Sequence, residues 1–306
     1  MVLFHADVVV AVLASGSRGN CTYVGDGKRG LVIDCGISTR QIRRRLASLG
    51  LNDAPLDFAL VTHEHADHVA AARVLQNDAA KRSGHPLPIF MTAGTRRGVH
   101  PASAPATWSR IEAGAPFEHA GVRVAPFAVP HDTREPVGFA VELSGVRVGV
   151  FTDLGRSTHL VERTLTALDV AVVEFNHDVD MLLQGSYPWA LKQRVRSAHG
   201  HLSNAQAADL LAAGARDAPR LRHVVLAHLS EENNRPDLAW EAAHDGLHRA
   251  GASKVEVHVA QQDAPCDVIR IAPPPPAPPA RAPRQVARRV GHPPQDLDRQ
   301  VLLFPT

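Results

Sequence analysis

The sequence has few cysteines, few aromatic residues and no long apolar run. Its three cysteines, Cys21, Cys35 and Cys266, form no CxxC pair, which argues against a disulfide framework and a thiolate zinc site. The longest apolar runs, such as 8–14, have only the length of a strand, so no membrane span is expected. The N-terminal residues lack the basic region of a signal peptide. We therefore expect a protein of the reducing cytoplasm.

The chain also has little net charge, and that charge is unevenly distributed. The formal net charge of the 306 residues is +2. From residue 273 onward five arginines stand against two aspartates, a net of +3, which leaves 2 − 3 = −1 for residues 1–272. The overall charge of the larger part therefore gives no argument for nucleic-acid binding, which has to be argued from local basic clusters.

The composition changes once, near residue 272. Ten of the 23 prolines lie in residues 273–306, and such a segment favours an extended conformation and cannot build a core. We therefore expect one domain over residues 1–272 and a disordered tail over 273–306, serving as an appendage or as a docking segment for a partner.

Residues 1–272 predict an α/β fold. Apolar or alternating runs typical of strands fill much of the chain, with hairpins in the first half and strand–helix alternation in the second. This mixture favours two mixed sheets packed together with helices outside, rather than a doubly wound parallel sheet. Helices are expected at roughly 38–49, 67–77, 157–166, 188–198, 204–213 and 236–250.

The run His63-Glu64-His65-Ala66-Asp67-His68 carries the strongest chemical signal. It begins where an apolar strand, 58–62, ends. Positions two apart in an extended chain face the same way, so His63 and His65 point into one site, while Asp67 and His68 fall on the first turn of the next helix. Imidazoles and a carboxylate suit Zn²⁺, Mn²⁺ or iron. The run therefore predicts a metal site.

Three further residues occupy the ends of apolar strands. His131, Asp153 and His228 each lie just after such a strand, at the positions where sites on α/β scaffolds form. Taken singly, each is as compatible with a turn residue as with a metal ligand. Together with the run, they supply enough ligands for two metal ions that share a bridge.

This pattern resembles the metallo-β-lactamase superfamily over nearly all of residues 8–260, and most of all its WalJ (YycJ) branch. The motifs that carry the resemblance, besides the histidine run, are Leu13-Ala14-Ser15-Gly16-Ser17-Arg18-Gly19-Asn20, Pro130-His131-Asp132, Glu174-Phe175-Asn176-His177-Asp178, Gly185-Ser186-Tyr187-Pro188, Gly200-His201-Leu202-Ser203-Asn204 and His228-Leu229-Ser230 with Asn233-Asn234.

The resemblance implies a four-layer αββα sandwich and a ligand set. His63, His65 and His131 would hold one divalent ion; Asp67, His68 and His228 would hold a second, and Asp153 would bridge the two. Asp34, at the end of an apolar strand, matches an aspartate that braces the histidine loop in this superfamily.

The superfamily contains lactamases, thioesterases and nucleases, so the fold alone selects no substrate. Aspartates at 67 and 153 are typical of its two-metal hydrolases, which include nucleases. The segment Gly200-His201-Leu202-Ser203 is similar to one in tRNA 3′-processing nucleases, where the histidine contacts the scissile phosphate or assists the leaving group. It precedes a predicted helix, whose N-terminus favours anions.

We therefore expect phosphodiester hydrolysis by a metal-bridged hydroxide, with Asp67, Asp153 and His201 as catalytic residues. The WalJ-like resemblance implies a 5′→3′ exonuclease on double-stranded DNA, linked to DNA repair. An RNA-processing nuclease or a thioesterase of the same fold is an alternative. A non-catalytic binding or regulatory protein that keeps the fold is an alternative of another class. The oligomeric state is not indicated.

Residues that contact the substrate are less sharply defined. His177 and Asp178 follow the strand 170–174, and a structural role in the loop is equally open for them; Ser203 is also a candidate helix cap. Two basic clusters occur on predicted helices, each of which is also explained as a solvated face. The cluster with Lys192, Arg194 and Arg196 precedes His201 and is the better candidate for a nucleic-acid backbone. The other contains Arg40, Arg43, Arg44 and Arg45.

Overall fold

Two β-sheets form the centre of the protein in a computed structural model, which describes residues 7–274. Seven strands build the first sheet: β1 (Val8–Ala14), β2 (Cys21–Gly25), β3 (Gly30–Ile33), β4 (Phe58–Leu60), β5 (Ile89–Thr92), β6 (Ser109–Ile111) and β14 (Ile269–Ile271). Their order is β14-β1-β2-β3-β4-β5-β6. The C-terminal strand β14 thus returns to the first sheet and pairs antiparallel with β1.

The second sheet is built from the middle and later parts of the chain. Its strands are β7 (Phe117–His119), β8 (Val122–Ala128), β9 (Val137–Leu143), β10 (Val146–Phe151), β11 (Val170–Glu174), β12 (His223–Ala227) and β13 (Glu256–Val259). The order is β13-β12-β11-β10-β9-β8-β7, parallel from β10 to β13 and antiparallel from β7 to β10.

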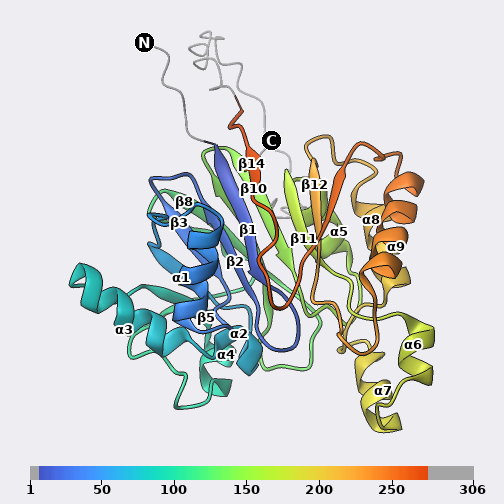
Figure 1. Ribbon diagram of the computed structural model, residues 1–306, viewed down its shortest axis with the longest axis horizontal. Helices are drawn as coiled ribbons and strands as arrows, with labels where there is room; N and C mark the ends of the chain where they lie inside the picture. The colour runs from blue at the N-terminus through green and yellow to red at the C-terminus, as the bar shows by residue number, and fades with distance from the viewer. Residues whose placement is uncertain (1–6, 275–306) are drawn as a thin grey trace, which may run out of the picture.

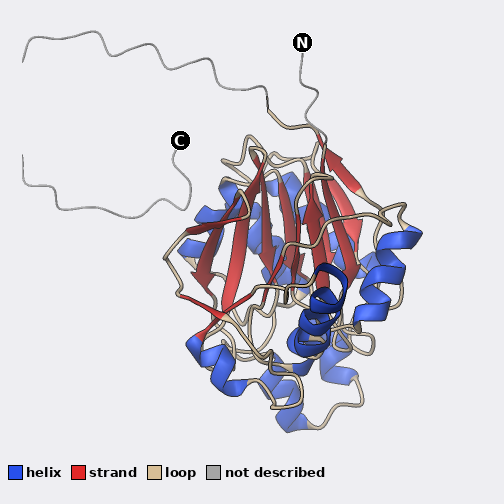
Figure 2. Cartoon of the chain, turned by 90° about the vertical axis from the view of Figure 1, so that its left-hand side faces the viewer, coloured by secondary structure: helices blue, strands red, loops and turns tan. Residues whose placement is uncertain are grey.

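Helices cover the outer face of each sheet (Figure 1). Beside the first sheet lie α1 (Thr39–Ser48), α2 (Ala66–Val69), α3 (Ala72–Ser83) and α4 (Ala93–Gly98). The later helices are α5 (His159–Thr166), α6 (Val179–Gln184), α7 (Trp189–Val195), α8 (Asn204–Gly214) and α9 (Pro236–Arg249). Of these, α5, α8 and α9 pack on the second sheet, whereas α6 and α7 project at one end of the molecule. A quarter turn shows the strands with helices around them (Figure 2).

The alternation of side chains along a strand explains why the strands are apolar on both faces. On β1, Val8, Val10 and Val12 join the core between the two sheets, while Val9 and Leu13 join a second core beneath the helices. A strand covered on both faces carries an almost continuous apolar run. The four-layer αββα architecture expected from the sequence is confirmed by this packing.

The structure differs from the expectations at several short elements. The helix expected at 67–77 is two helices, because the backbone after β3 interrupts it: Cys35 N donates to His68 O, and Ala71 N donates to Cys35 O. β6, β7, α4 and α6 were not expected, since three to six residues are too few to establish a period. Of the predicted tail, only residues 273 and 274 lie within the described part of the chain.

Within residues 7–274, no helix combines the length and apolar character that crossing a bilayer would require.

Candidate metal centre

The candidate site lies at one end of the sandwich, where several strands from both sheets stop. Asp34 follows β3, Asp153 lies two residues beyond β10, and His228 follows β12. All three residues adopt positive φ angles of 61°, 59° and 55°, respectively. Non-glycine residues in this left-handed region are strained, and such strain tends to gather at functional sites. These strand ends therefore turn their side chains at an energetic cost.

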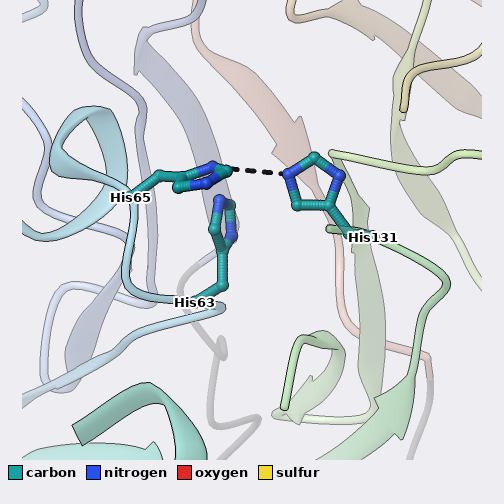
Figure 3. A group of neighbouring side chains, drawn as sticks. All are labelled: His63, His65 and His131. Atoms are coloured by element: carbon teal, nitrogen blue, oxygen red, sulfur yellow. Dashed lines mark hydrogen bonds between the residues drawn. The ribbon is translucent and has the colours of Figure 1, made fainter. Parts of the chain in front are cut away.

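Three histidines form the first group of neighbouring side chains (Figure 3). His63 and His65 come from the loop after β4, and His131 comes from the loop after β8. His131 Nε2 lies 3.4 Å from His65 Nδ1, and the His63 ring centroid lies 4.8 Å from that of His65 and 5.0 Å from that of His131. One nitrogen from each ring falls within 4.8 Å of the others, a spacing that lets the three bind one ion.

Asp67, His68 and His228 form the second group. Asp67 Oδ2 lies 3.3 Å from His68 Nε2 and 3.5 Å from His228 Nε2. The first two residues stand in and beside the first turn of α2, and His228 reaches them from the other sheet. A site of this kind therefore joins the two halves of the sandwich.

Asp153 lies between the two groups. Its carboxylate is 3.1 Å from His68 Nε2, 3.7 Å from His131 Nε2 and 3.7 Å from His228 Nε2. The side chain is almost fully buried, at 3% exposure. The structure thus brings together all seven residues named as ligands from the sequence, with Asp153 in contact with members of both groups.

Unpaired polar atoms test whether these residues fit a metal ion. His63 Nε2, His228 Nε2 and Asp153 Oδ2 are buried and accept or donate no hydrogen bond within residues 7–274. Leaving such atoms unpaired costs about 1–3 kcal/mol each. A divalent cation satisfies imidazole nitrogens and a carboxylate oxygen together, and this donor set suits Zn²⁺, Mn²⁺ or iron. The residues present therefore fit divalent metal.

The electrostatics of the site favour deprotonated ligands in part of the set. Burial, reinforced by the neighbouring His68, holds the pKa of His63 well below its usual range, so its imidazole is neutral and able to bind metal. Burial opposes ionisation of Asp153, but His228 and His68 outweigh it and lower its pKa. Burial likewise opposes the charged form of His228, yet Asp153 and Asp67 raise its pKa to about 10. The anionic carboxylates thus attract positive charge, which a metal ion would supply instead of a proton.

A hydrogen-bonded brace supports the histidine loop. Asp34 Oδ2 lies 2.8 Å from His68 Nδ1, and Asp34 Oδ1 accepts from Thr62 N at 2.9 Å. The Thr62 hydroxyl also lies 3.0 Å from His63 Nδ1. The contacts to His68 Nδ1 and His63 Nδ1 fix the ring nitrogens that face away from the candidate ligand groups, which leaves Nε2 of each ring to bind a metal ion. Asp34 therefore occupies the bracing place that the resemblance implies.

Glu174 is a site residue that the sequence analysis did not single out. It ends β11 and is fully buried, and it lies 2.8 Å from His201 Nδ1 and 3.3 Å from His228 Nδ1. It also accepts from Leu154 N and Leu202 N. Burial opposes its ionisation, but His201 lowers its pKa to about 2. A charged residue at the last position of an otherwise apolar strand was the signal that could have identified it.

Two asparagines also contact the site and were given no role from the sequence. Asn20, in the loop after β1, places Nδ2 3.1 Å from His68 Nε2, and Asn176, after β11, places Nδ2 3.2 Å from His228 Nδ1. The loop 15–20 contacts the site from the first sheet, and its Ser15 Oγ accepts from His228 N. These contacts position the loops that carry the histidines.

His201 lies beside the centre rather than within the two groups. Its Nδ1 is 3.6 Å from Asp153 Oδ1, and its ring stacks on that of His228 with centroids 5.2 Å apart. Burial opposes its protonation, but Glu174 and Asp153 raise its pKa. The side chain remains about one-fifth exposed, so it borders both the buried ligands and the solvent.

Among the residues expected to contact the substrate, two are helix caps and one is a buried histidine. Ser203 caps α8 by accepting from Gln206 N, and Asp178 caps α6 by accepting from Met181 N. His177 is buried, and its Nδ1 has no hydrogen-bond partner among the described residues. Capping thus accounts for Ser203 and Asp178, whereas the contacts of His177 leave one ring nitrogen unused.

The two basic residues of α7 differ in their exposure and in their partners. Lys192 is buried, and its ammonium donates to the carbonyl oxygens of Leu183 and Gly185 at 2.7 Å each. Its charge therefore serves the turn between α6 and α7, not the surface expected from the sequence. Arg194 is exposed and pairs with Asp132, next to His131, at 2.6 Å. Of these two residues, only Arg194 places its charged group in an exposed position at the edge of the site.

Comparison with known proteins identifies the family. Residues 29–228 match the model of the β-lactamase superfamily domain. The chain belongs to the β-lactamase superfamily. Exodeoxyribonuclease YycJ of Bacillus anthracis is 32% identical over 79% of this chain and 89% of its own, and exodeoxyribonuclease WalJ of Streptococcus pneumoniae strain D39 is 31% identical over 75% and 84%. These relatives confirm the likeness to the WalJ (YycJ) branch.

Solved structures agree on the fold. The metallo-β-lactamase-fold protein YhfI from Bacillus subtilis superposes with a TM-score of 0.64 over 86% of this chain and 99% of its own, at 17% identity. The protein is therefore a hydrolase of the metallo-β-lactamase fold, a fold that implies binding of divalent metal by clusters of histidine and aspartate like those described above.

Proposed function

We propose that this hydrolase is a two-metal nuclease, specifically a 5′→3′ exonuclease on double-stranded DNA with a role in DNA repair. The observation that carries the proposal is the position of Asp153, whose carboxylate lies within 4 Å of histidines from both groups of candidate ligands. A shared carboxylate of this kind is suited to holding two cations close together, the arrangement used for in-line displacement at phosphorus.

In this proposal each cation has its own ligands and shares one. His63, His65 and His131 would hold the first, Asp67, His68 and His228 would hold the second, and Asp153 would be shared between them. Zn²⁺ and Mn²⁺ both accept such ligands, and iron does so as well. When bound, the two cations supply an activated water and neutralise the negative charge of the phosphoryl oxygens.

The chain's own residues provide the proton for the leaving oxygen. Glu174 engages His201 Nδ1, so His201 Nε2 is the ring nitrogen left for the substrate. The raised pKa of His201 keeps the ring protonated closer to neutral pH than an isolated imidazole. A protonated imidazole beside the centre then donates to the departing oxygen as a general acid.

Arg194 is the residue we assign to the nucleic-acid backbone. Its guanidinium is largely exposed, and through Asp132 it is anchored next to His131. Phosphates contribute most of the salt-dependent affinity of nucleic-acid binding, and arginine at the edge of the centre supplies one such contact. The buried His177, with its unused Nδ1, is proposed as a further contact of the substrate.

The choice of DNA rests on the relatives, two of which are named exodeoxyribonucleases.

The three described cysteines are all free and buried, in agreement with the cytoplasmic location we propose.

The test is a substrate panel. Protein stripped of metal by a chelator receives Mn²⁺ or Zn²⁺ and is then given end-labelled single- and double-stranded DNA, the same strands as RNA, and an acyl thioester. We expect stepwise shortening of duplex DNA from its 5′ end. Preferred cleavage of RNA would instead identify an RNA-processing nuclease, and cleavage of the thioester alone would overturn the phosphodiester assignment.

A further inference from the structure

A second cluster of ligand-type side chains lies on β12 and β13, away from the centre described above. His223 begins β12 and pairs in parallel register with Glu256 on the edge strand β13. His258 stands two positions beyond Glu256, so its side chain leaves the same face of β13. The three side chains therefore meet on one face of the last two strands.

The distances within this cluster match a metal site. His223 Nδ1 lies 3.1 Å from His258 Nε2 and 3.5 Å from Glu256 Oε2. Ligand atoms at about 2.0–2.1 Å from a tetrahedral zinc ion are separated by about 3.3–3.4 Å. The two distances from His223 thus bracket the separation that coordination requires.

The types of side chain and their access to solvent also favour a metal site. Two imidazoles and one carboxylate are ligands for zinc and related ions, and they leave a fourth position for water. The His223 side chain is 15% exposed, whereas Glu256 is 70% exposed and its carboxylate can be approached from solution. Of the nearby cationic side chains, Arg222 is engaged with Asp169 through its Nη2 at 3.0 Å.

We propose that His223, Glu256 and His258 bind a divalent transition-metal ion, such as Zn²⁺, Ni²⁺ or Cu²⁺, at a site separate from the catalytic centre. The site fastens the edge strand β13 to β12. His223 begins β12 and His228 directly follows its last residue, a separation of five residues or roughly 16 Å along a strand. No residue is shared with the catalytic ligands, so the proposal does not depend on the nuclease assignment.

The test counts bound metal. Full-length protein is stripped with a chelator, dialysed against buffers of nanomolar to micromolar free Zn²⁺, and analysed for zinc per chain. We expect His223→Ala and His258→Ala each to bind one zinc fewer than the wild type, while hydrolysis of a model phosphodiester stays at the wild-type level. Zinc content equal to the wild type in both variants would overturn the proposal.

One control variant and one further test variant accompany the histidine substitutions. His159→Ala removes a fully exposed histidine on α5 and is expected to bind as much zinc as the wild type. Glu256→Gln removes a largely exposed carboxylate, so the fold is retained even if the histidine variants fail to fold, and we expect the extra zinc to be lost at the lowest concentrations that fill it in the wild type. Unchanged occupancy in Glu256→Gln would remove the carboxylate from the site.

A local readout separates this site from the catalytic one. Metal that joins the two strands should slow amide hydrogen exchange in residues 256–259, because within the described part of the chain β13 pairs with β12 alone. We expect added Zn²⁺ to slow exchange there in the wild type and in His159→Ala, and not in His258→Ala. Equal slowing in His258→Ala would contradict the proposal.

Discussion

The carboxylate of Glu174 lies 2.8 Å from Nδ1 of His201 and links the second sheet to the edge of the metal centre. Glu174 is held in turn by two backbone N–H groups, from Leu154 and Leu202, so it has little freedom to move. Its position explains how a histidine outside the ligand groups acquires a fixed orientation and a raised pKa. In the proposed mechanism Glu174 is a positioning residue, because it would act on the substrate through His201.

Glu174→Gln should therefore reduce turnover and shift its pH dependence. A general acid works while it is protonated, so activity falls as the pH rises through the pKa of His201. Removing the charge of Glu174 lowers that pKa, and the alkaline fall in kcat should move to lower pH. We expect a loss of about 10²-fold in kcat at neutral pH, within the usual range for general acid catalysis. The measurement is a kcat–pH profile on a model phosphodiester.

Glu142→Gln is the control for that variant, since Glu142 lies on β9 and pairs with Arg147. Its pH profile should match the wild type. A Glu174→Gln enzyme with reduced kcat but an unmoved alkaline limb would assign Glu174 a purely structural role.

The brace between Asp34 and His68 leads to a prediction on metal affinity. Asp34→Asn keeps the size of the side chain and tolerates the positive φ at this position, but it removes the charge that faces His68 Nδ1. Loss of such a partner typically weakens metal binding or activity about 10–100-fold. Competition with a coloured chelator measures the affinity. An affinity equal to that of the wild type would show that the brace contributes nothing to the site.

Lys192 and Arg194, neighbours on α7, should give opposite results. Lys192→Ala leaves two carbonyl oxygens without their donor, and we expect a lower Tm with little change in the salt dependence of DNA binding. Arg194→Ala removes an exposed charge at the site, and we expect the slope of log K against log salt to decrease by about 1 with little change in Tm. Arg40→Ala, on α1, serves as the surface control. The reverse pattern would show that Lys192 contacts the nucleic acid.

The seven candidate ligands could be named from the sequence because their positions follow simple local rules. His63, His65 and His68 lie in one short run, His228 directly follows β12, and His131 lies three residues beyond β8. Parallel strands end at the same edge of a sheet, so residues at those ends gather without any knowledge of side-chain rotamers. The two-sheet architecture was also predictable from local rules, because the longer strands and helices show their hydrophobic periods in the sequence.

The parts that the sequence could not predict depend on where side chains point. Glu174 is separated by 27 residues from His201, and nothing local states that the two meet. Lys192 resembles any charged helical residue until the α6–α7 turn places two carbonyls beside its ammonium. His223 and His258 come together only through the pairing of β12 with β13. Each of these contacts is set by tertiary packing.

The most direct test of the proposed centre is hydrolysis of a model phosphodiester by Asp153→Ala, measured together with metal content. Asp153 lies between both ligand groups, so we expect turnover to be abolished and metal binding weakened while the far-UV spectrum is preserved. Asp26→Ala is the matched control, because Asp26 is a buried carboxylate that pairs with Arg29 far from the site and its loss should leave turnover intact. Hydrolysis at the wild-type rate by Asp153→Ala would contradict the account.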